Sequence, residues 1–353
     1  ILGLYQLKHM ALKPFAAVNE TVKLAKQCNK VWARGLINAV LRRYLREGES
    51  LEQALSDNLE FKHSHPLWLI KRFQAAKLSV TDVCRENEKR APVCLRINTQ
   101  KISRDEYQKL LVKQDIIALE SPYLDNALVL ETKVNVTELP HFKKGYVFIQ
   151  DIAAQFACSL LDLTDGLTVL DACSAPGGKL TAMLEVAPSL KKVVALDSSE
   201  SRMKRINENL TRLNQSAERV VGDARTPSVW WNGELFDRVL LDAPCSAIGV
   251  IRRHPDIKLL RTPEAVRDAV KRQQEILTSL WPLLAPGGRL VYATCSILPE
   301  ENERQIEHFI EQSEDAKHVD IHLPLGQAKT MGWQLLPGES DGFYYCVLEK
   351  RMG

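Results

Sequence analysis

The sequence predicts a chain of several domains, in which an all-helical region and a small α+β module precede an α/β domain with a Rossmann-like, doubly wound parallel sheet. Three observations support this prediction. The chain has 353 residues, enough for two or three hydrophobic cores. Its first 89 residues show helical periodicity without strand-like alternation. From residue 166 onward, short apolar runs alternate with helical stretches, as strands and crossover helices do in parallel sheets.

Residues 1–89 are expected to form the helical domain. Five apolar residues repeat at helical spacing within residues 31–46, namely Leu36, Ile37, Val40, Leu41 and Tyr44. Glu47-Gly48 supplies a stop signal, and His65-Pro66 opens a further helix. Since the first residue is Ile1 rather than Met, we expect the native N-terminus to lie upstream of it.

A run of basic residues marks this region. Residues 21–46 contain no acidic residue and seven basic ones, which are Lys23, Lys26, Lys30, Arg34, Arg42, Arg43 and Arg46. A charge run is commonly a solvated helix face. A run of one sign also suits a surface that faces phosphates, so both interpretations stay open.

The small α+β module is expected at residues 90–150. Its strand candidates are short apolar runs at residues 93–97, 116–119, 127–130 and 146–149. Ser103 and Glu106 form a capping-box pattern that opens a short helix.

Residues 151–353 are expected to form the α/β domain, which a helix at residues 152–161 introduces. Strand candidates lie at residues 167–170, 193–196, 219–221, 238–241 and 290–293. Helices are expected at residues 177–186, 200–213, 263–284 and 300–311. Residues 312–342 show no regular period, and residues 342–347 form a last strand, antiparallel at or near the sheet edge.

The composition is that of an ordinary soluble protein, with 45% hydrophobic and 26% charged residues and a net charge of +3. No apolar run is long enough to span a membrane, so no membrane partner is expected. The eight cysteines include no C-x-x-C pair, which argues against a metal site and against a disulfide scaffold. A reducing cytoplasm is the natural location.

The first strands of the α/β domain end in a pattern that suits a nucleoside ligand. Paired glycines at 177 and 178 follow the first strand and would expose backbone amides, yet the pattern is neither Walker A nor G-x-G-x-x-G. Asp171, Asp197 and Asp223 end successive strands. Each alone could be a helix N-cap. As a series without a phosphate-binding lysine pattern, they favour a cofactor that lacks phosphates, and S-adenosylmethionine has that chemistry.

Two cysteines end further strands of the same sheet. Cys245 follows Asp242 after residues 238–241, and Cys295 follows residues 290–293. A single buried cysteine is commonly packing. Two thiols beside a methyl-donor site instead suit methylation of a pyrimidine carbon, because C5 of cytosine becomes nucleophilic when a thiolate adds to C6. Asp242 is placed to assist that addition, while the residues alone do not decide which thiol attacks.

These motifs resemble those of the Sun family of RNA (cytosine-5)-methyltransferases over nearly the whole chain. The matching segments are residues 150–151, 171–179, 242–246, 252–256 and 294–296. Residues 1–50 resemble the helical NusB-like domain that precedes the catalytic domain in this family. Two departures are Ser174, where alanine is usual, and Ile248, where threonine is common.

The resemblance implies roles for individual residues. Cys295 would be the nucleophile, and Cys245 would assist release of the methylated product. Lys179 would face the same pocket and contact the cofactor or the base. The residues that would hold S-adenosylmethionine are Cys173, Ser174, Ala175, Pro176, Gly177, Gly178, Lys179, Asp197, Asp223 and Asp242.

The resemblance also implies a monomer that methylates C5 of a specific cytosine in 16S, small-subunit ribosomal RNA through a covalent cysteine–C6 adduct. Arg252, Arg253 and His254 would contact RNA, although a solvated surface loop is the simpler interpretation of these three. The target base must be single-stranded or flipped out for C6 to be attacked. Two alternatives remain: cytosine-5 methylation of transfer RNA, and a non-catalytic ribosome assembly factor.

Overall fold

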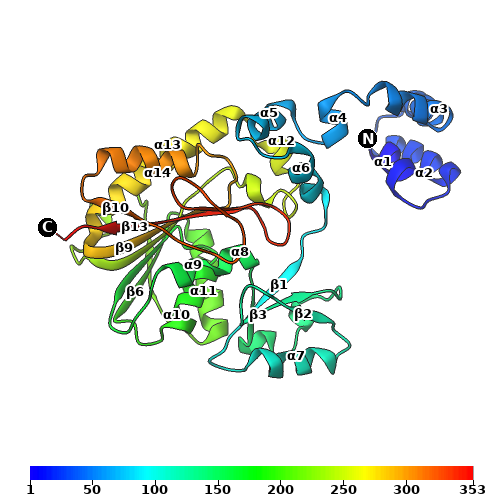
Figure 1. Ribbon diagram of the computed structural model, residues 1–353. Helices are drawn as coiled ribbons and strands as arrows, with labels where there is room; N and C mark the ends of the chain where they lie inside the picture. Colours follow the sequence, from blue (N-terminus) through cyan, green and yellow to red (C-terminus); the bar gives the residue numbers. More distant parts are fainter. Residues whose placement is uncertain (353) are drawn as a thin grey trace. The chain divides into compact units, whose positions relative to one another are not determined.

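The computed structural model describes residues 1–352 and forms two compact units, Ile1–Ile70 and Lys71–Gly353. The first unit is helical (Figure 1). Its helices are α1 (Leu2–His9), α2 (Pro14–Gln27), α3 (Ala33–Ala54), α4 (Leu59–His63) and the start of α5 (Leu67–Ala75). The predicted domain boundaries at residues 89/90 and 150/151 stay predictions.

Helix α3 extends beyond the predicted stop at Glu47-Gly48 and ends at Ala54. Arg43 pairs with Glu47 one turn later at 2.8 Å, and the Tyr44 hydroxyl donates to Glu52 at 2.5 Å. The contact between Tyr44 and Glu52 spans Gly48, and a single glycine inside a helix costs only about 1 kcal/mol. Of the predicted apolar face, Leu41 is buried, whereas Leu36 and Val40 are exposed.

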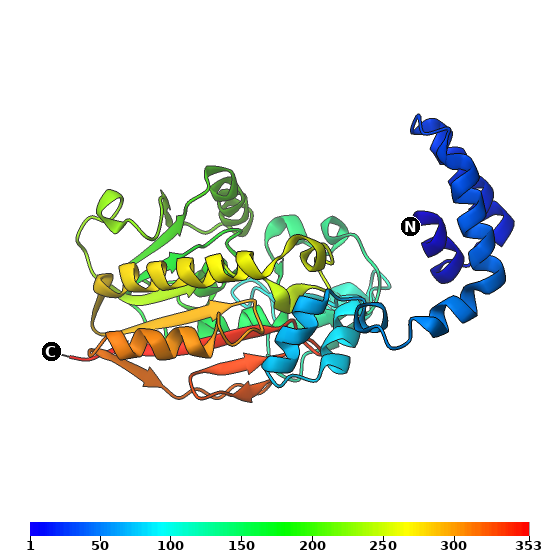
Figure 2. The ribbon, with the colours of Figure 1, turned by 90° about the horizontal axis from the view of Figure 1, so that it is seen from above.

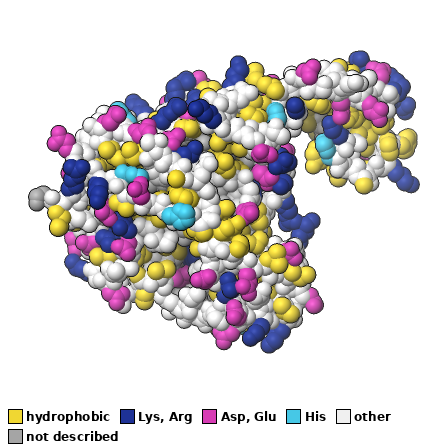
Figure 3. Space-filling view, viewed as in Figure 1, with side chains coloured by type: hydrophobic (Ala, Val, Ile, Leu, Met, Phe, Trp, Pro, Cys, Tyr) yellow, Lys and Arg dark blue, Asp and Glu magenta, His cyan; other side chains and the backbone are white. Residues whose placement is uncertain are grey.

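The basic run lies on the surface of α2 and α3. All seven of its side chains are exposed. Figure 3 shows Lys and Arg side chains on the surface of this helical unit. The exposure fits both interpretations of the run, a solvated face and a phosphate-facing surface.

The second unit begins with the rest of α5 and with α6 (Val80–Glu88), followed by a small antiparallel sheet of order β2-β3-β1-β4. Its strands are β1 (Val93–Ile97), β2 (Ala118–Glu120), β3 (Ala127–Leu130) and β4 (Val147–Ile149), with α7 (Arg104–Val112), η1 (Val136–Glu138) and η2 (Phe142–Lys144) between them. The capping box of Ser103 and Glu106 at the start of α7 is confirmed. Leu95 pairs with Leu128 and Ile149 and is fully buried.

The larger sheet has the order β11-β12-β13-β9-β8-β5-β6-β7, and β10 also pairs with β13. Its parallel part is built from β5 (Thr168–Ala172), β6 (Lys192–Asp197), β7 (Glu218–Val221), β8 (Phe236–Asp242) and β9 (Leu284–Thr294). Its antiparallel part consists of β10 (Ala316–Val319), β11 (Gln327–Ala328), β12 (Trp333–Leu335) and β13 (Phe343–Lys350).

The last strand was expected at or near the edge, but β13 lies inside the sheet between β9 and β12. The segment 312–342, which shows no period in the sequence, contributes β10, β11 and β12. Each of these strands has two to four residues, too few for an alternation to be visible in the sequence. The predicted parallel strands are confirmed, although β9 begins at Leu284, where a helix was expected to end.

Helices cover both faces of this sheet. Helices α13 (Pro263–Leu280) and α14 (Glu303–Gln312) run side by side over one face (Figure 2). Helices α8 (Ile152–Gln155), α9 (Ala157–Leu160), α10 (Gly178–Val186) and α11 (Glu200–Leu213) cover the other face. Leu241 packs toward α13, while its neighbour Leu240 packs toward α9. Short helices η3 (Pro227–Val229), η4 (Ile248–Val250), α12 (Ile257–Leu260) and η5 (Trp281–Leu283) lie in the connections.

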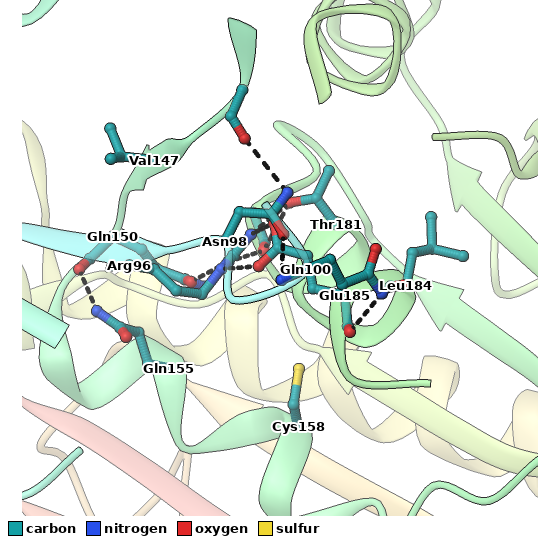
Figure 4. Close-up of polar contacts among 12 residues, drawn as sticks. Arg96, Asn98, Gln100, Val147, Gln150, Gln155, Cys158, Thr181, Leu184 and Glu185 are labelled. Atoms are coloured by element: carbon teal, nitrogen blue, oxygen red, sulfur yellow. Dashed lines mark hydrogen bonds and ion pairs between the residues drawn. The ribbon is translucent and has the colours of Figure 1, made fainter. Parts of the chain in front are cut away.

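A buried arginine joins the small sheet to helix α10. Arg96 on β1 donates from Nε and Nη2 to the two carboxylate oxygens of Glu185 on α10, at 2.9 and 3.0 Å. It also donates to Thr181 Oγ1 at 2.9 Å, to the Gly178 carbonyl at 2.6 Å and to Gln150 (Figure 4). Arg96 therefore holds the helix that follows the glycine-rich turn.

Candidate functional site

A cavity lies at the carboxyl ends of the parallel strands, where the strand order reverses around β5. Open α/β sheets bind ligands at such switch points. The cavity has a volume of about 390 Å³, within the usual range for small-molecule sites. Seven of the residues singled out in the sequence line it: Cys173, Ala175, Asp197, Asp223, Asp242, Cys245 and Cys295.

The glycine-rich turn, residues 173–179, connects β5 to α10. Gly177 caps α10 with a φ of +94°, a left-handed conformation that favours glycine. Its neighbour Gly178 starts the helix and lies close to the Phe148 ring. A Cβ atom added at Gly178 would come within 3.2 Å of that ring. The Pro176 carbonyl accepts a hydrogen bond from Asn209 at 3.0 Å. The turn is thus fixed by the module on one side and by α11 on the other.

The three strand-end carboxylates differ in their surroundings. Asp197 is buried and accepts hydrogen bonds from the amides of Ser199 and Ala175, at 2.9 and 3.2 Å, while Arg202 pairs with it at 2.8 Å. Asp223 pairs with Arg225 at 2.7 Å, and this hydrogen bond lowers the pKa of the Asp223 carboxyl.

Asp171 lies beneath the turn rather than in the cavity lining. Burial raises the pKa of its carboxyl to about 7, although a hydrogen bond from Ser174 Oγ at 2.6 Å acts in the opposite direction and lowers it. Its other oxygen, Oδ1, is buried without a hydrogen-bond partner among the described residues. Burial also raises the pKa of the neighbouring Cys173 thiol to about 12, so this cysteine is protonated at neutral pH.

The two cysteines lie next to each other in the lining of the cavity. Their Sγ atoms are 3.4 Å apart, and both residues are partly exposed. The hydrogen bond to Cys295, together with burial, raises the pKa of the Cys245 thiol well above its usual value. The two thiols are thus in direct hydrogen-bond contact, in which either sulfur can donate.

Lys179 also belongs to this site, and it donates to Asp242 Oδ2 at 2.6 Å. Its Nζ atom also lies 5.0 Å from the centre of the Phe343 ring. Burial lowers the pKa of Lys179, but the charge of Asp242, the hydrogen bond to it and the charge of Cys295 outweigh burial and raise it. A fixed ammonium thus lies beside both a carboxylate and a thiol.

The predicted RNA-contacting residues separate into two groups. Arg252 donates to Asp341 Oδ1 at 2.7 Å and to the Gly338 carbonyl at 2.7 Å, and it is buried. Arg253 bonds to Asp341 and, at 2.7 Å, to Asp151. Both guanidinium groups pair with carboxylates of this chain, Arg252 in the core and Arg253 at a partly exposed position, and their contact with RNA stays a prediction. His254 is exposed, so its contact with RNA stays a prediction.

Sequence reasoning missed several residues of the site. Arg202, Arg225 and Arg272 line the cavity. Glu301 is fully buried behind the two cysteines. Arg202 in the first turn after Asp197, Arg225 two residues after Asp223 and Glu301 six residues after Cys295 each lie near a predicted site residue, whereas Arg272 reaches the cavity from α13 with no such signal. Within residues 1–352 no cluster of potential metal ligands occurs, and no described helix is long and apolar enough to cross a membrane.

Comparisons with known proteins agree with this architecture. The family described as 16S rRNA methyltransferase RsmB/F matches residues 158–349, an associated ferredoxin-like domain matches residues 65–137, and the NusB family matches residues 1–46. The ribosomal RNA small subunit methyltransferase B of Vibrio cholerae is 46% identical over 99% of this chain and 80% of its own length. The protein of the same name from Pseudomonas syringae is 44% identical, with the same coverage of both chains.

Solved structures show the same fold. The crystal structure of PH0851 superposes with a TM-score of 0.85 at 28% identity and covers 99% of this chain and 80% of its own. A methyltransferase homologue from Pyrococcus horikoshii has a TM-score of 0.67 at 25% identity, covering 81% of this chain and 99% of its own. The order of domains, the motifs of the site and the similarity over nearly the whole chain agree: this chain belongs to the RsmB/F family of 16S rRNA methyltransferases.

Proposed function

We propose that this chain transfers a methyl group from S-adenosylmethionine to C5 of a cytosine in small-subunit ribosomal RNA through a covalent cysteine adduct. The observation that carries the proposal is the pair of thiols, 3.4 Å apart, that lie with Asp242 on one nucleoside-sized cavity. A methyltransferase that acts on oxygen or nitrogen has no need of a nucleophilic thiol. The names of the relatives from Vibrio and Pseudomonas support ribosomal RNA as the substrate.

The lining residues fit S-adenosylmethionine. Asp197 already accepts from two amides and pairs with Arg202, but a carboxylate has about four acceptor sites, so it retains capacity for a ribose hydroxyl. Asp223 on the neighbouring strand end and Asp242 near the thiols add further carboxylate acceptors to the lining, beside Arg202, Arg225 and Arg272. When bound, S-adenosylmethionine supplies the electrophilic methyl group.

The two cysteines have different tasks in this proposal. Cys295 lies 3.4 Å from the Cys245 sulfur and near the Lys179 ammonium. As the resemblance to the family implies, Cys295 is the thiol that adds to C6 of cytosine, and Asp242 assists at N3. Once C5 carries the methyl group, its proton passes to a general base, the C5–C6 double bond re-forms and the bond between C6 and sulfur breaks. Cys245 then donates to the departing thiolate, which is its contribution to product release.

The test is covalent trapping on RNA that contains 5-fluorocytosine. With Cys295→Ala, the protein–RNA adduct should be absent. With Cys245→Ala, the adduct should form and should accumulate even on unmodified RNA. Cys28→Ala changes an exposed cysteine of the helical unit and serves as the control. Trapping by the Cys295 variant with loss in the Cys245 variant would reverse the assignment, and no adduct in any form of the protein would favour an assembly factor.

The class of RNA is tested separately. Mapping of 5-methylcytosine in ribosomal and transfer RNA from cells with and without the gene should show loss of one site in small-subunit ribosomal RNA. If only a transfer RNA site is lost, transfer RNA is the substrate in place of ribosomal RNA, and the proposed chemistry is unchanged.

A further inference from the structure

Glu301 is a fully buried carboxylate in the segment between β9 and α14. Its Oε1 atom accepts hydrogen bonds from the Ser246 amide at 2.7 Å and from Gln273 Nε2 at 3.2 Å. Its Oε2 atom accepts from the hydroxyls of Ser246 and Ser296, both at 2.5 Å. All of these partners donate, so the group is held as an acceptor at both oxygens.

The two serines are the immediate neighbours of the two cysteines. Ser246 follows Cys245, Ser296 follows Cys295, and the serine Oγ atoms are 3.5 Å apart. The parallel pairing of β8 and β9 ends at Asp242 and Ala293, before either thiol. Beyond that point, Glu301 is bonded to both of the segments that carry the thiols.

Burying a charged group in a protein core has a large cost in desolvation free energy. Apolar residues of similar volume are commonly as stable as a buried charged group with its partners. The charge of Glu301 acts on the thiol pair in addition to its hydrogen bonds. After the hydrogen bond with Cys295, burial and the charge of Cys295, it is a further cause of the raised pKa of Cys245. Glu301 thus favours the protonated form of the Cys245 thiol.

We propose that Glu301 is a positioning residue, which sets the spacing of Cys245 and Cys295 by bonding to the serine that follows each of them. The inference rests on the proposed function, because the spacing matters for chemistry only if the thiols act together. It assigns Glu301 no contact with RNA or with the methyl donor.

The test variant is Glu301→Gln, which keeps the volume and removes the charge. The matched control is Glu303→Gln, the same change two residues later at the start of α14. In the test variant, kcat should fall about 10- to 100-fold, as expected when reacting groups are displaced by about 1 Å. KM for RNA should be unchanged, and the alkaline limb of the kcat profile should shift to lower pH. The control should match the wild type.

A second measurement is independent of methylation. Diamide takes up two electrons and two protons as two neighbouring thiols form a disulfide, and the rate reports how closely the thiols are held. The Cys245–Cys295 disulfide, identified by peptide mass, should form at least about fivefold more slowly in Glu301→Gln than in the wild type, as expected for a thiol with poorer access to its partner. If the two proteins show this difference but the wild type forms no RNA adduct, the proposed function fails and the positioning role stands.

The proposal is overturned if Glu301→Gln lowers the melting temperature but keeps the wild-type kcat, pH profile and disulfide rate, since Glu301 would then serve stability alone. Should that variant fail to fold, Ser246→Ala and Ser296→Ala each remove one hydroxyl bond and leave the carboxylate in place. Each should slow disulfide formation, and wild-type rates in both would equally refute the positioning role.

Discussion

The ammonium of Lys179 lies 2.6 Å from the Asp242 carboxylate, so the helix after the glycine-rich turn is joined directly to the end of β8. Lys179→Met should leave Asp242 without this partner and remove a positive charge from beside Cys295. We expect adduct formation on 5-fluorocytosine RNA to slow about 100-fold in single-turnover assays, a typical loss for a group that stabilises developing charge.

Lys191→Met is the control, because Lys191 pairs with Glu234 at an exposed position, at 3.1 Å. It should form the adduct at the wild-type rate. An equal loss in both variants would show that the effect comes from general destabilisation.

Asp171 predicts a pH dependence of stability. Burial raises the pKa of its carboxyl to about 7, whereas aspartate in an unfolded chain titrates near pH 4. Between about pH 4 and 7 the folded state therefore binds more protons, and its stability falls as the pH rises. Asp171→Asn resembles the protonated acid, so it should gain up to about 4 kcal/mol relative to the wild type across this window.

Urea unfolding at several pH values measures this difference. Asp165→Asn alters an exposed aspartate and should follow the wild-type curve. Parallel curves for Asp171→Asn and the wild type would contradict the prediction.

The contributions of Arg96 and Glu185 to the free energy of unfolding should depend strongly on each other. Arg96→Met leaves a buried carboxylate without its cation and should lower the free energy of unfolding by about 3 to 5 kcal/mol. The double variant Arg96→Met with Glu185→Met should recover most of that loss, because no charge remains buried. Arg104→Met, which breaks a more exposed pair with Glu120, should cost at most about 1 kcal/mol. Additive losses in the double variant would be inconsistent with this coupling.

Salt dependence distinguishes buried arginines from basic residues that face RNA. Arg252→Met should lower the free energy of unfolding by about 3 kcal/mol, and the slope of log Kd for RNA against log salt should not change. Lys26→Gln with Lys30→Gln, on the exposed basic run, should reduce the magnitude of that slope by about one for each phosphate that the protein no longer neutralises. An unchanged slope in the lysine variant would identify the run as a solvated face.

Much of the fold could be predicted because its signals are local. The strands that end at Ala172, Asp197 and Asp242 are short apolar runs followed by turn residues, and each run predicts a strand without knowledge of its partners. Strands β10 to β12 were missed because pairing with neighbours, not a sequence pattern, stabilises such short segments.

The site was predictable only in part, because some partners are distant in sequence. Arg252 lies 89 residues from Asp341, and no pattern near Arg252 indicates that a carboxylate buries it. Glu301 lies 55 residues from Ser246, so its link to Cys245 is visible only in three dimensions. The motifs carry the chemistry, whereas the contacts that position them come from tertiary structure.

The place of β13 has a consequence for how the protein is made. Strand β13 pairs with β9, which leads to Cys295, yet a ribosome synthesises β13 after every other strand of the sheet. Until Phe343–Lys350 has left the exit tunnel, β9 has one open edge, a surface that pairs readily with other chains. The strand that leads to Cys295 therefore gains this partner only after the rest of the sheet has been synthesised, and a nascent chain that stalls before Phe343 lacks it.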